Sequence, residues 1–179
     1  AGSLDSDSDG LTDAWEQGYG RYQIVPGNFT WEQAKADAEV RGGHLATVTS
    51  QGEWALIRQQ FTDQLTLEVL GEKNRLFLGA TDLETEGVWR WVTGEPWQNL
   101  SDFWWLTNPS NEFGEENYLE LINAKYQGFE TDKLFVNDIR PVVSAWANGG
   151  YLLEYGYPTD PTKADTDGDG FNDSIESHY

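Results

Sequence analysis

Two stretches near opposite ends of the chain share one spacing of acidic residues. The first is residues 5–16 (DSDSDGLTDAWE) and the second is residues 165–176 (DTDGDGFNDSIE). Each has Asp at positions 1, 3, 5 and 9, Gly at position 6 and Glu at position 12. Oxygen ligands at this spacing, with glycine at the turn, are what a twelve-residue calcium loop requires. The pattern therefore predicts a calcium site near each end of the chain.

The ligands of the two predicted sites follow from the loop positions. The residue at position 7 would bind through its backbone carbonyl, and the Glu at position 12 through both carboxylate oxygens. Gly10 and Gly170 take the position where the chain must turn sharply. The predicted ligands are Asp5, Asp7, Asp9, Leu11, Asp13 and Glu16, and then Asp165, Asp167, Asp169, Phe171, Asp173 and Glu176. The alternative is a solvated acidic tail at each end, although two full matches make chance a poor explanation.

Neither loop has the leading helix of a paired EF-hand, because only AGSL precedes the first and YGYPTDPTKA the second. The run DPTKADTDGDGFNDSIE at residues 160–176 resembles the thrombospondin type 3, or dockerin-like, calcium repeat. The resemblance implies an extracellular setting and a chain that is part of a larger multidomain protein. The expected organisation is a calcium repeat at 1–18, a central domain at 19–157 and a second calcium repeat at 158–179.

The composition limits the kinds of partner that the chain can bind and the location in which it can act. The 179 residues include 31 acidic and 11 basic side chains, for a net charge of −20. Ten of the acidic residues lie in the two loops, and the other 21 still outnumber the basic ones, so nucleic acid is excluded as a partner. No apolar run predicts membrane insertion. Weak calcium sites fill where calcium is millimolar, which favours a secreted or cell-surface location.

The central region begins with a predicted strand at 21–25 and two predicted helices. In the first helix Thr30 is the N-cap and forms a capping box with Gln33, and the helix ends at Gly42-Gly43. Its apolar face is expected to contain Ala34, Ala38 and Val40. The second helix begins after Ser50, with Glu53 three residues later and with Trp54, Ile57 and Phe61 at helical spacing.

The chain then turns to predicted β structure. Residues 76–82 and 88–92 are expected to form a hairpin, and 117–122, 134–138 and 150–155 further strands. Trp89 and Trp91 alternate with Arg90 and are predicted core residues. Between these strands, residues 93–116 form a long aromatic and polar segment without a clear period, and a loop of that length inside a compact domain is usually functional.

The order of these elements resembles the C-type lectin-like fold, in which two helices precede a small sheet and a long loop emerges between strands. The segments that carry the resemblance are AKADAEVRGGHLATVTSQGEW (34–54), LFLGATD (76–82), GEENYLEL (114–121), FVND (135–138) and YLLEY (151–155). The resemblance implies an α+β fold with small antiparallel sheets, flanked by EF-hand-like calcium loops at both termini. It also implies that the first and last strands pair, which would bring the two calcium loops together.

The chain departs from the family in having no cysteine. The positions that match the family's two disulfides are Ala38 with Leu153 and Tyr118 with Pro141. Packing there must replace stabilisation worth roughly 2–5 kcal/mol per bridge. The absence of cysteine together with the flanking repeats favours a bacterial member of the family.

The resemblance also implies a third calcium site in the long loop, where family members hold calcium and two sugar hydroxyls together. The matching residues are the triplet Asn108-Pro109-Ser110, the glutamate Glu116 and the pair Asn137-Asp138. Pro109 stands where the family has a cis proline, and Ser110 is a shorter ligand than the usual side chain. The implied ligands are therefore Asn108, Ser110, Glu116, Asn137 and Asp138. The alternative is that Asn137 and Asp138 close a turn and Glu116 is solvated.

The long loop also carries three consecutive aromatic residues, Phe103, Trp104 and Trp105. All three cannot face inward, so Trp104 and Trp105 are candidates for a platform that stacks on a sugar or contacts a protein. The alternative is that one of them fills the space beneath the loop.

Two functions remain open at this point. The first is a calcium-binding extracellular recognition module that binds carbohydrate through the long loop. The second is a protein-binding or adhesion module in which calcium is purely structural. An enzyme is not expected, because His44 and His178 are isolated and no nucleophile elbow, P-loop or zinc pattern is present.

Overall fold

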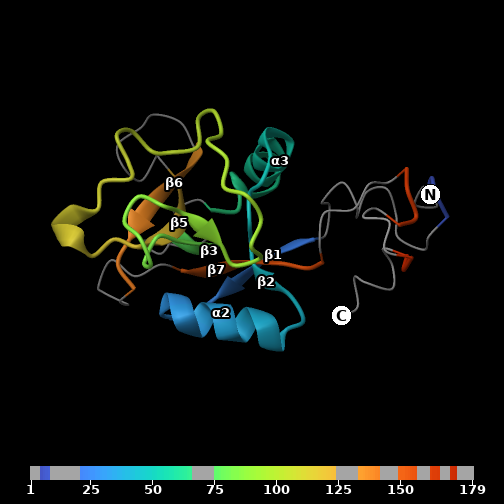
Figure 1. Cartoon of the computed structure of the whole chain (residues 1–179), viewed down its shortest axis with the longest axis horizontal. Coiled ribbons are helices and arrows are strands. Elements are labelled where there is room, and N and C mark those ends of the chain that lie inside the picture. Colours follow the sequence, from blue (N-terminus) through green and yellow to red (C-terminus); the bar gives the residue numbers. More distant parts are fainter. Residues whose placement is uncertain are drawn as a thin grey trace.

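A computed structural model provides the structure of the chain. It describes residues 5–8, 21–65, 75–123, 133–141, 149–156, 162–165 and 170–172. The central region accounts for most of this, with its helices and strands arranged as in Figure 1. No helix in the described ranges is long and apolar enough to cross a membrane.

The centre of the domain is a mixed β-sheet. Its strands are β1 (Tyr22–Pro26), β2 (His44–Leu45), β3 (Arg75–Thr81), β4 (Arg90–Trp91), β5 (Tyr118–Asn123), β6 (Leu134–Ile139) and β7 (Gly150–Glu154). The order across the sheet is β1-β7-β3-β5-β6, with β2 beside β7 and β4 beside β3. The expected hairpin of β3 and β4 and the expected pairing of β1 with β7 are both confirmed.

The expectation of small antiparallel sheets is wrong in one respect. The described strands belong to one sheet, and β3 and β7 are parallel where Phe77 meets Tyr151. The reason is that β7 comes from the end of the domain and inserts between β1 and β3 rather than adding at an edge. Pairings of this kind depend on segments far apart in the sequence, which local patterns do not encode.

Two α-helices begin where the sequence predicts. In α2 (Trp31–Val40) the Thr30 hydroxyl accepts a hydrogen bond from the Gln33 N–H at 3.2 Å, and the Gln33 side chain accepts one from the Thr30 N–H at 2.9 Å. In α3 (Gln51–Phe61) the Ser50 hydroxyl accepts from the Glu53 N–H at 3.1 Å. Both N-caps are therefore confirmed.

The predicted apolar face of α2 is only partly right. Ala34 and Ala38 are fully buried, whereas Val40 is 86% exposed. A residue two places after Ala38 lies about 200° further around a helix with 3.6 residues per turn, so Val40 points away from the sheet.

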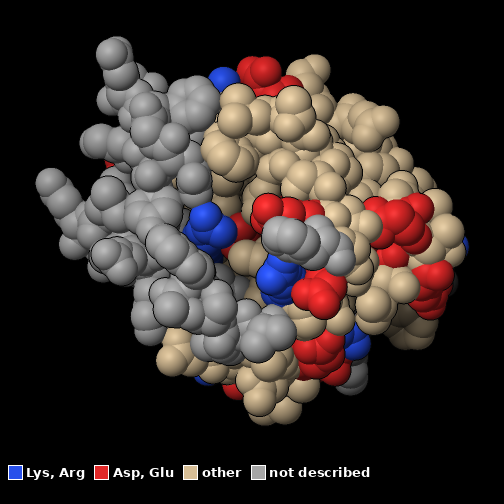
Figure 2. All heavy atoms as spheres, turned by 90° about the vertical axis from the view of Figure 1, so that its left-hand side faces the viewer, with Lys and Arg blue, Asp and Glu red and all other residues tan. Residues whose placement is uncertain are grey.

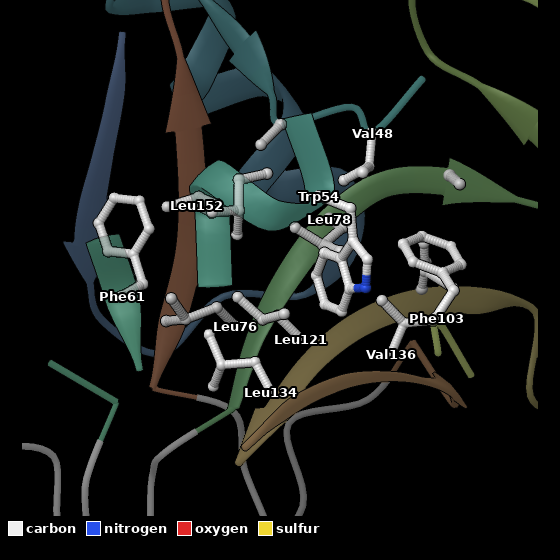
Figure 3. Packing of buried hydrophobic residues seen from close by; sticks show 14 of the residues in the cluster. Val48, Trp54, Phe61, Leu76, Leu78, Phe103, Leu121, Leu134, Val136 and Leu152 are labelled. Carbon is white, nitrogen blue, oxygen red and sulfur yellow. The ribbon is translucent and has the colours of Figure 1, made fainter. Parts of the chain in front are cut away.

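The two helices cover opposite faces of the sheet. Neighbouring residues of a strand point to opposite faces, and on β3 Leu76 and Leu78 pack with α3 whereas Phe77 packs with α2. Figure 3 shows the larger cluster, in which Trp54 and Phe61 of α3 lie against Leu76, Leu78, Leu121, Leu134 and Leu152 of the strands. Trp89 and Trp91 are also buried there, as predicted.

The second cluster contains residues at which the sequence resemblance implies the cysteines of the family. Ala38 of α2 and Leu153 of β7 are both fully buried in it, together with Tyr118 of β5. Trp31 in the same cluster donates its indole N–H to the Leu78 carbonyl at 2.8 Å, which ties α2 to the sheet. The contact between α2 and β7 is therefore formed by apolar side chains.

The chain enters and leaves the domain at one place. The Tyr155 N–H donates to the Arg21 carbonyl at 2.9 Å, just beyond the β1–β7 ladder. Arg21 also donates from its guanidinium to the carboxylate of Glu154, and both side chains are buried. The segments that precede β1 and follow β7 therefore start side by side.

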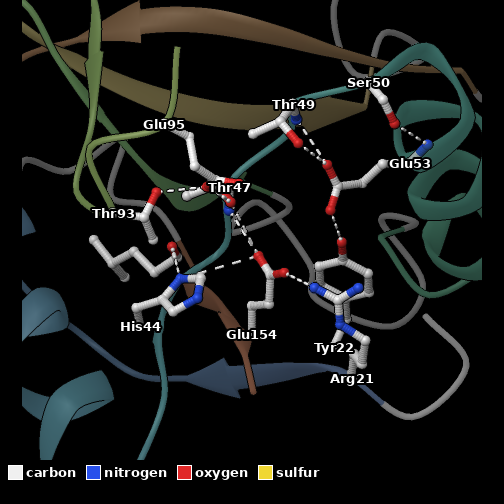
Figure 4. A network of polar contacts seen from close by, with 11 residues as sticks. Arg21, Tyr22, His44, Thr47, Thr49, Ser50, Glu53, Thr93, Glu95 and Glu154 are labelled. Carbon is white, nitrogen blue, oxygen red and sulfur yellow. Dashed lines mark hydrogen bonds and ion pairs between the residues drawn. The ribbon is translucent and has the colours of Figure 1, made fainter. Parts of the chain in front are cut away.

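A polar network extends from this ion pair to the long loop (Figure 4). The second carboxylate oxygen of Glu154 accepts from the Thr47 N–H at 3.0 Å. The Thr47 hydroxyl lies 3.3 Å from that oxygen and 3.2 Å from the carboxylate of Glu95, near the start of the long loop. Burial raises the pKa of Glu154 to about 8 against the attraction of Arg21.

Candidate functional site

The long loop is attached to the sheet through β6. The Val136 N–H donates to the Phe103 carbonyl at 2.8 Å, and the Trp105 N–H donates to the Val136 carbonyl at 2.9 Å. The Asn108 N–H then closes a turn onto the Trp105 carbonyl at 3.1 Å. This attachment places the triplet that begins at Asn108 beside Asn137 and Asp138 of β6.

The peptide bond between Asn108 and Pro109 is cis, as the resemblance implies. The triplet then contacts β6 directly. The Asp138 carboxylate oxygen Oδ2 accepts from the Ser110 N–H at 2.7 Å and from the Asn111 N–H at 2.5 Å. The Asn108 side-chain amide donates to the side-chain oxygen of Asn137.

Glu116 completes the group from the end of the long loop. Its carboxylate oxygen Oε2 accepts from the Ser110 hydroxyl at 3.1 Å and from the Glu112 N–H, in the short 3-10 helix η1 (Glu112–Gly114), at 2.8 Å. Burial raises the pKa of Glu116, and the nearby charge of Asp138 raises it further, whereas the Glu112 N–H opposes both. The structure therefore brings all five residues of the implied long-loop site together. We call this group, Asn108, Ser110, Glu116, Asn137 and Asp138, the long-loop site.

Two buried carboxylates next to the long-loop site were missed from the sequence. Glu120 of β5 is fully buried and lies 3.0 Å from both the Arg75 guanidinium and the Asn137 amide. Burial raises the pKa of Glu120 to about 7. A glutamate between two leucines in a predicted strand was the available signal, because a charge in an apolar run needs a partner.

Asp82 is the other missed carboxylate, and it is only 2% exposed. It directly follows β3, and its oxygen Oδ2 accepts from the Gly87 N–H at 2.9 Å. Burial raises the pKa of Asp82, and the charge of Asp138 adds to this. Asp82 and Glu116 thus lie close enough to Asp138 for its negative charge to contribute to the raised pKa of each.

The oxygen atoms of the long-loop site are of the kind that calcium binds, namely carboxylate, amide and hydroxyl oxygens. Asp138 is fully buried, and its oxygen Oδ1 has no hydrogen-bond partner among the residues described. The same residues contain no group of three His, Cys, Asp or Glu side chains arranged to hold a metal. A cation here would therefore need the neutral oxygens of Asn108, Ser110 and Asn137 besides two carboxylates.

Acidic side chains also gather on the surface at this end of the domain, beside Lys and Arg side chains (Figure 2). Glu112 and Glu115 are exposed, and Glu115 lies 3.6 Å from the Arg140 guanidinium. The described surface around the long loop is therefore of mixed charge rather than basic.

The aromatic residues of the long loop form a cluster around Trp97. Its ring stacks on Trp91 at 4.9 Å between centroids and lies within 6.1 Å of Trp89, Phe103 and Trp104. Phe103 is buried, and Trp104 and Trp105 are half-buried. Trp104 packs against Trp89 at 5.4 Å, so much of its ring serves the core. Among the described side chains of the long loop, Leu106 is the large apolar one that is exposed, at 67%.

Only part of the two terminal loops lies in the described residues. Asp5 and Asp7 of the first loop and Asp165, Gly170 and Phe171 of the second are described. Gly170 has φ = +99°, as expected for the turn position, and its N–H donates to the Asp165 carboxylate at 2.9 Å. The other predicted ligands lie outside the described residues, namely Asp9, Leu11, Asp13, Glu16, Asp167, Asp169, Asp173 and Glu176.

Known structures share this fold. The C-type lectin carbohydrate-recognition domain of the mouse scavenger receptor superposes with a TM-score of 0.54 and 23% identity, over 73% of this chain and 84% of that one. The C-type lectin domain of murine dendritic cell inhibitory receptor 2, in complex with N-glycan, gives a TM-score of 0.55 and 20% identity over 74% and 89%. At these identities the likeness establishes the fold alone.

Sequence relatives give the same family. Halomucin of Haloquadratum walsbyi is 31% identical over 172 residues, which are 86% of this chain and 2% of that protein. C-type lectin domain family 4 member F of Mus musculus is 37% identical over 83 residues, 45% of this chain and 13% of that protein. The chain thus spans only a small part of the length of these relatives. The family model described as Lectin C-type domain matches residues 28–131, more than half of the chain. The chain belongs to the C-type lectin domain family.

Proposed function

We propose that this chain is a calcium-dependent carbohydrate-binding module that acts through the long-loop site. Proteins of the C-type lectin family are binding modules rather than enzymes, and the related domains include one solved in complex with N-glycan and one solved in the presence of an oligosaccharide. No residue has a catalytic role in this function. The long loop binds a cation through its oxygen ligands, and the cation in turn binds a sugar.

The main support for this function is that Asp138 is fully buried while one of its carboxylate oxygens has no hydrogen-bond partner among the described residues. A fully buried carboxylate with one oxygen lacking a partner among the described residues is costly, because its desolvation is not offset. A cation bound between Asp138 and Glu116 would offset that cost. It would also reduce the repulsion by Asp138 that adds to the effect of burial in raising the pKa of Glu116.

The chemistry follows from the coordination that calcium prefers. Calcium takes six to eight oxygens, so five protein side chains leave positions for a vicinal diol. In the structure the Asn108 side chain donates a hydrogen bond to Asn137, and the Ser110 hydroxyl donates one to Glu116. These hydrogen bonds use several of the atoms that would bind calcium. Calcium must displace these contacts, and Ser110 is a short ligand. We therefore expect weak binding, of the order seen in extracellular sites, roughly 0.1–1 mM.

We extend the proposal to the termini. The spacing of the acidic residues, and the turn at Gly170 with its hydrogen bond to Asp165, support two further calcium ions in thrombospondin type 3-like or dockerin-like repeats at 1–18 and 158–179. Together with the cysteine-free domain at 19–157, this supports a module of a larger bacterial-type protein that is secreted or displayed at the cell surface.

The experiment is a calorimetric titration of the metal-free chain with calcium, taken to about 10 mM because extracellular sites are weak. We expect three sites, with one lost in Asp138→Asn and none lost in the control Asp63→Asn, an exposed carboxylate at the end of α3. A glycan array with and without a chelator then follows. Two sites in both the parent chain and Asp138→Asn would contradict calcium binding in the long loop, and calcium-independent glycan binding would contradict the proposed mechanism.

A second function, a protein-binding or adhesion module with purely structural calcium, is favoured by one observation. Leu106 is 67% exposed next to the half-buried Trp104 and Trp105, a small apolar patch of the kind that protein interfaces use. If this function holds, Leu106→Ser should abolish binding to a protein partner, and the parent chain should show no calcium-dependent binding on a glycan array. Calcium-dependent glycan binding that Leu106→Ser retains would support the carbohydrate function.

A further inference from the structure

Two tripeptides in the described part of the chain have the sequence that accepts an N-linked glycan. They are Asn28-Phe29-Thr30 and Asn99-Leu100-Ser101, each an asparagine followed two places later by a hydroxyl residue with no proline between them. Asn108-Pro109-Ser110 fails this condition because of its proline. Tripeptides of this kind also arise by chance, so an acceptor asparagine must in addition lie on an exposed part of the chain.

Asn28 is exposed and lies in the connection between β1 and α2. The segment is held on both sides, because the Gly27 N–H donates to the Gly149 carbonyl at 3.0 Å and Thr30 caps α2. The asparagine itself is outside any helix or strand. Because Asn28 is exposed and outside the sheet, a large group attached to it would break no backbone hydrogen bond of the sheet.

Asn99 is exposed in the long loop, again outside any helix or strand. The hydroxyl residue Ser101 is held at the start of α3, where its N–H donates to the Gln51 side chain at 2.9 Å and its carbonyl accepts from that side chain at 3.4 Å. These contacts use the backbone of Ser101 and leave the side chain of Asn99 uninvolved. Both acceptor asparagines thus lie on exposed connections just before an anchored residue.

Neither position belongs to the long-loop site. Asn28 follows β1, at the opposite edge of the sheet from β6, which carries Asn137 and Asp138. Asn99 is next to the start of α3, and residues 103–105 run along β6 between it and Asn108. Bulky groups at these two places would leave the long-loop site accessible.

We propose that Asn28 and Asn99 are N-glycosylation sites. The donor class is an oligosaccharide carried on a lipid pyrophosphate, and a membrane-bound transferase catalyses the step. The side-chain nitrogen Nδ2 forms a bond to the anomeric carbon of the first sugar, the bond from that carbon to the pyrophosphate oxygen breaks, and Nδ2 loses one proton. The proposal rests on the export of the chain, which is part of the proposed function.

The test uses the full chain with a secretion signal, produced in a eukaryotic host that attaches N-linked glycans. Asn172 also begins an acceptor tripeptide, so Asn172→Gln serves as the background. Intact mass before and after an endoglycosidase should show glycan at two positions, and each of Asn28→Gln and Asn99→Gln should remove one of them. Asn108 serves as an internal negative control.

Matched variants of the hydroxyl residue separate glycosylation from folding. Ser101→Thr and Thr30→Ser should keep the glycan, whereas Ser101→Ala should lose the glycan at Asn99 and still be secreted. A secreted, folded chain without glycan at either asparagine would overturn the proposal, and glycan at only one would overturn it for the other. Calcium titration of the same samples reports on the long-loop site independently, so failure of this proposal is distinguishable from failure of the proposed function.

Discussion

Arg21 and Glu154 form an ion pair at the end of the β1–β7 ladder, with side chains that are only 4% and 0% exposed. The pair lies where the chain enters and leaves the domain, and Glu53 and Glu95 add negative charge nearby. A buried ion pair is strongly destabilised when one partner is removed, because the remaining charge has no counter-ion. The stability of this end of the β1–β7 ladder therefore depends on these two residues.

We predict that Arg21→Met lowers the free energy of unfolding by about 3–5 kcal/mol at pH 9, where Glu154 is ionised. The measurement is urea denaturation followed by tryptophan fluorescence. Lys35→Met is the control, because it removes an exposed pair with Glu39 and should cost less than about 1 kcal/mol. Equal losses in the two variants would contradict the prediction, whereas adding Glu154→Leu to Arg21→Met should recover much of the loss.

The same carboxyl group predicts a pH dependence of stability. Burial raises the pKa of Glu154 from 4.5 to about 8, so the folded state holds a proton that the unfolded chain releases. This contribution to stability is complete below about pH 4.5 and is lost as the pH rises to about 8. The difference in unfolding free energy between the parent chain and Glu154→Gln should therefore fall over this range. Denaturation from pH 4.5 to 9 in a chelator tests this, and a constant difference would show that the pKa is not raised.

A new disulfide between α2 and β7 should stabilise the domain. Ala38 and Leu153 are fully buried in one cluster, and the sequence resemblance implies a cysteine pair of the family at these two positions. The double variant Ala38→Cys and Leu153→Cys, once oxidised, should be about 2–4 kcal/mol more stable than in its reduced form. Thiol counting and urea denaturation with and without a reductant measure this. Two thiols that stay free under oxidising conditions would show that the positions do not face each other.

Gly170 provides a test of the C-terminal calcium loop. Its φ of +99° is strained for any residue with a Cβ, although no neighbouring atom would obstruct one. Gly170→Ala should cost about 1–2 kcal/mol in the bound loop and so weaken calcium binding roughly five- to thirtyfold. Gly52→Ala is the control, because a Cβ there meets only the Ser50 hydroxyl at 3.9 Å and Gly52 lies within α3. Calcium titration that finds no change for Gly170→Ala would exclude the predicted loop geometry.

Local features of this fold were predictable because they depend on residues within one or two turns. Thr30 and Gln33 are three places apart, and their capping box forms as the sequence indicates. The spacing of Trp54, Ile57 and Phe61 likewise identifies the buried face of α3. Val40 shows the limit of this reasoning, since an apolar residue near a helix end was assigned to the core and is instead exposed.

The identities of the long-loop residues came from a resemblance in spacing, but their contacts depend on the fold. Asp138 accepts hydrogen bonds from Ser110 and Asn111, which are 28 and 27 places away. The buried neighbours Asp82 and Glu120, and the packing of Trp104 on Trp89, also arise between segments that meet only in the folded domain. A pattern of residue types cannot indicate which carboxylate loses its solvent.

The sequence by itself determined the starts of the two helices, the hairpin of β3 and β4 and the order of elements typical of the family. Each of these follows from backbone geometry and side-chain chemistry over a short stretch of chain. Only the tertiary structure decided the parallel pairing of β3 with β7, the burial of Arg21 with Glu154 across 133 residues and the assembly of the long-loop site. The physical reason is that burial and charge pairing depend on which distant segments exclude water from one another.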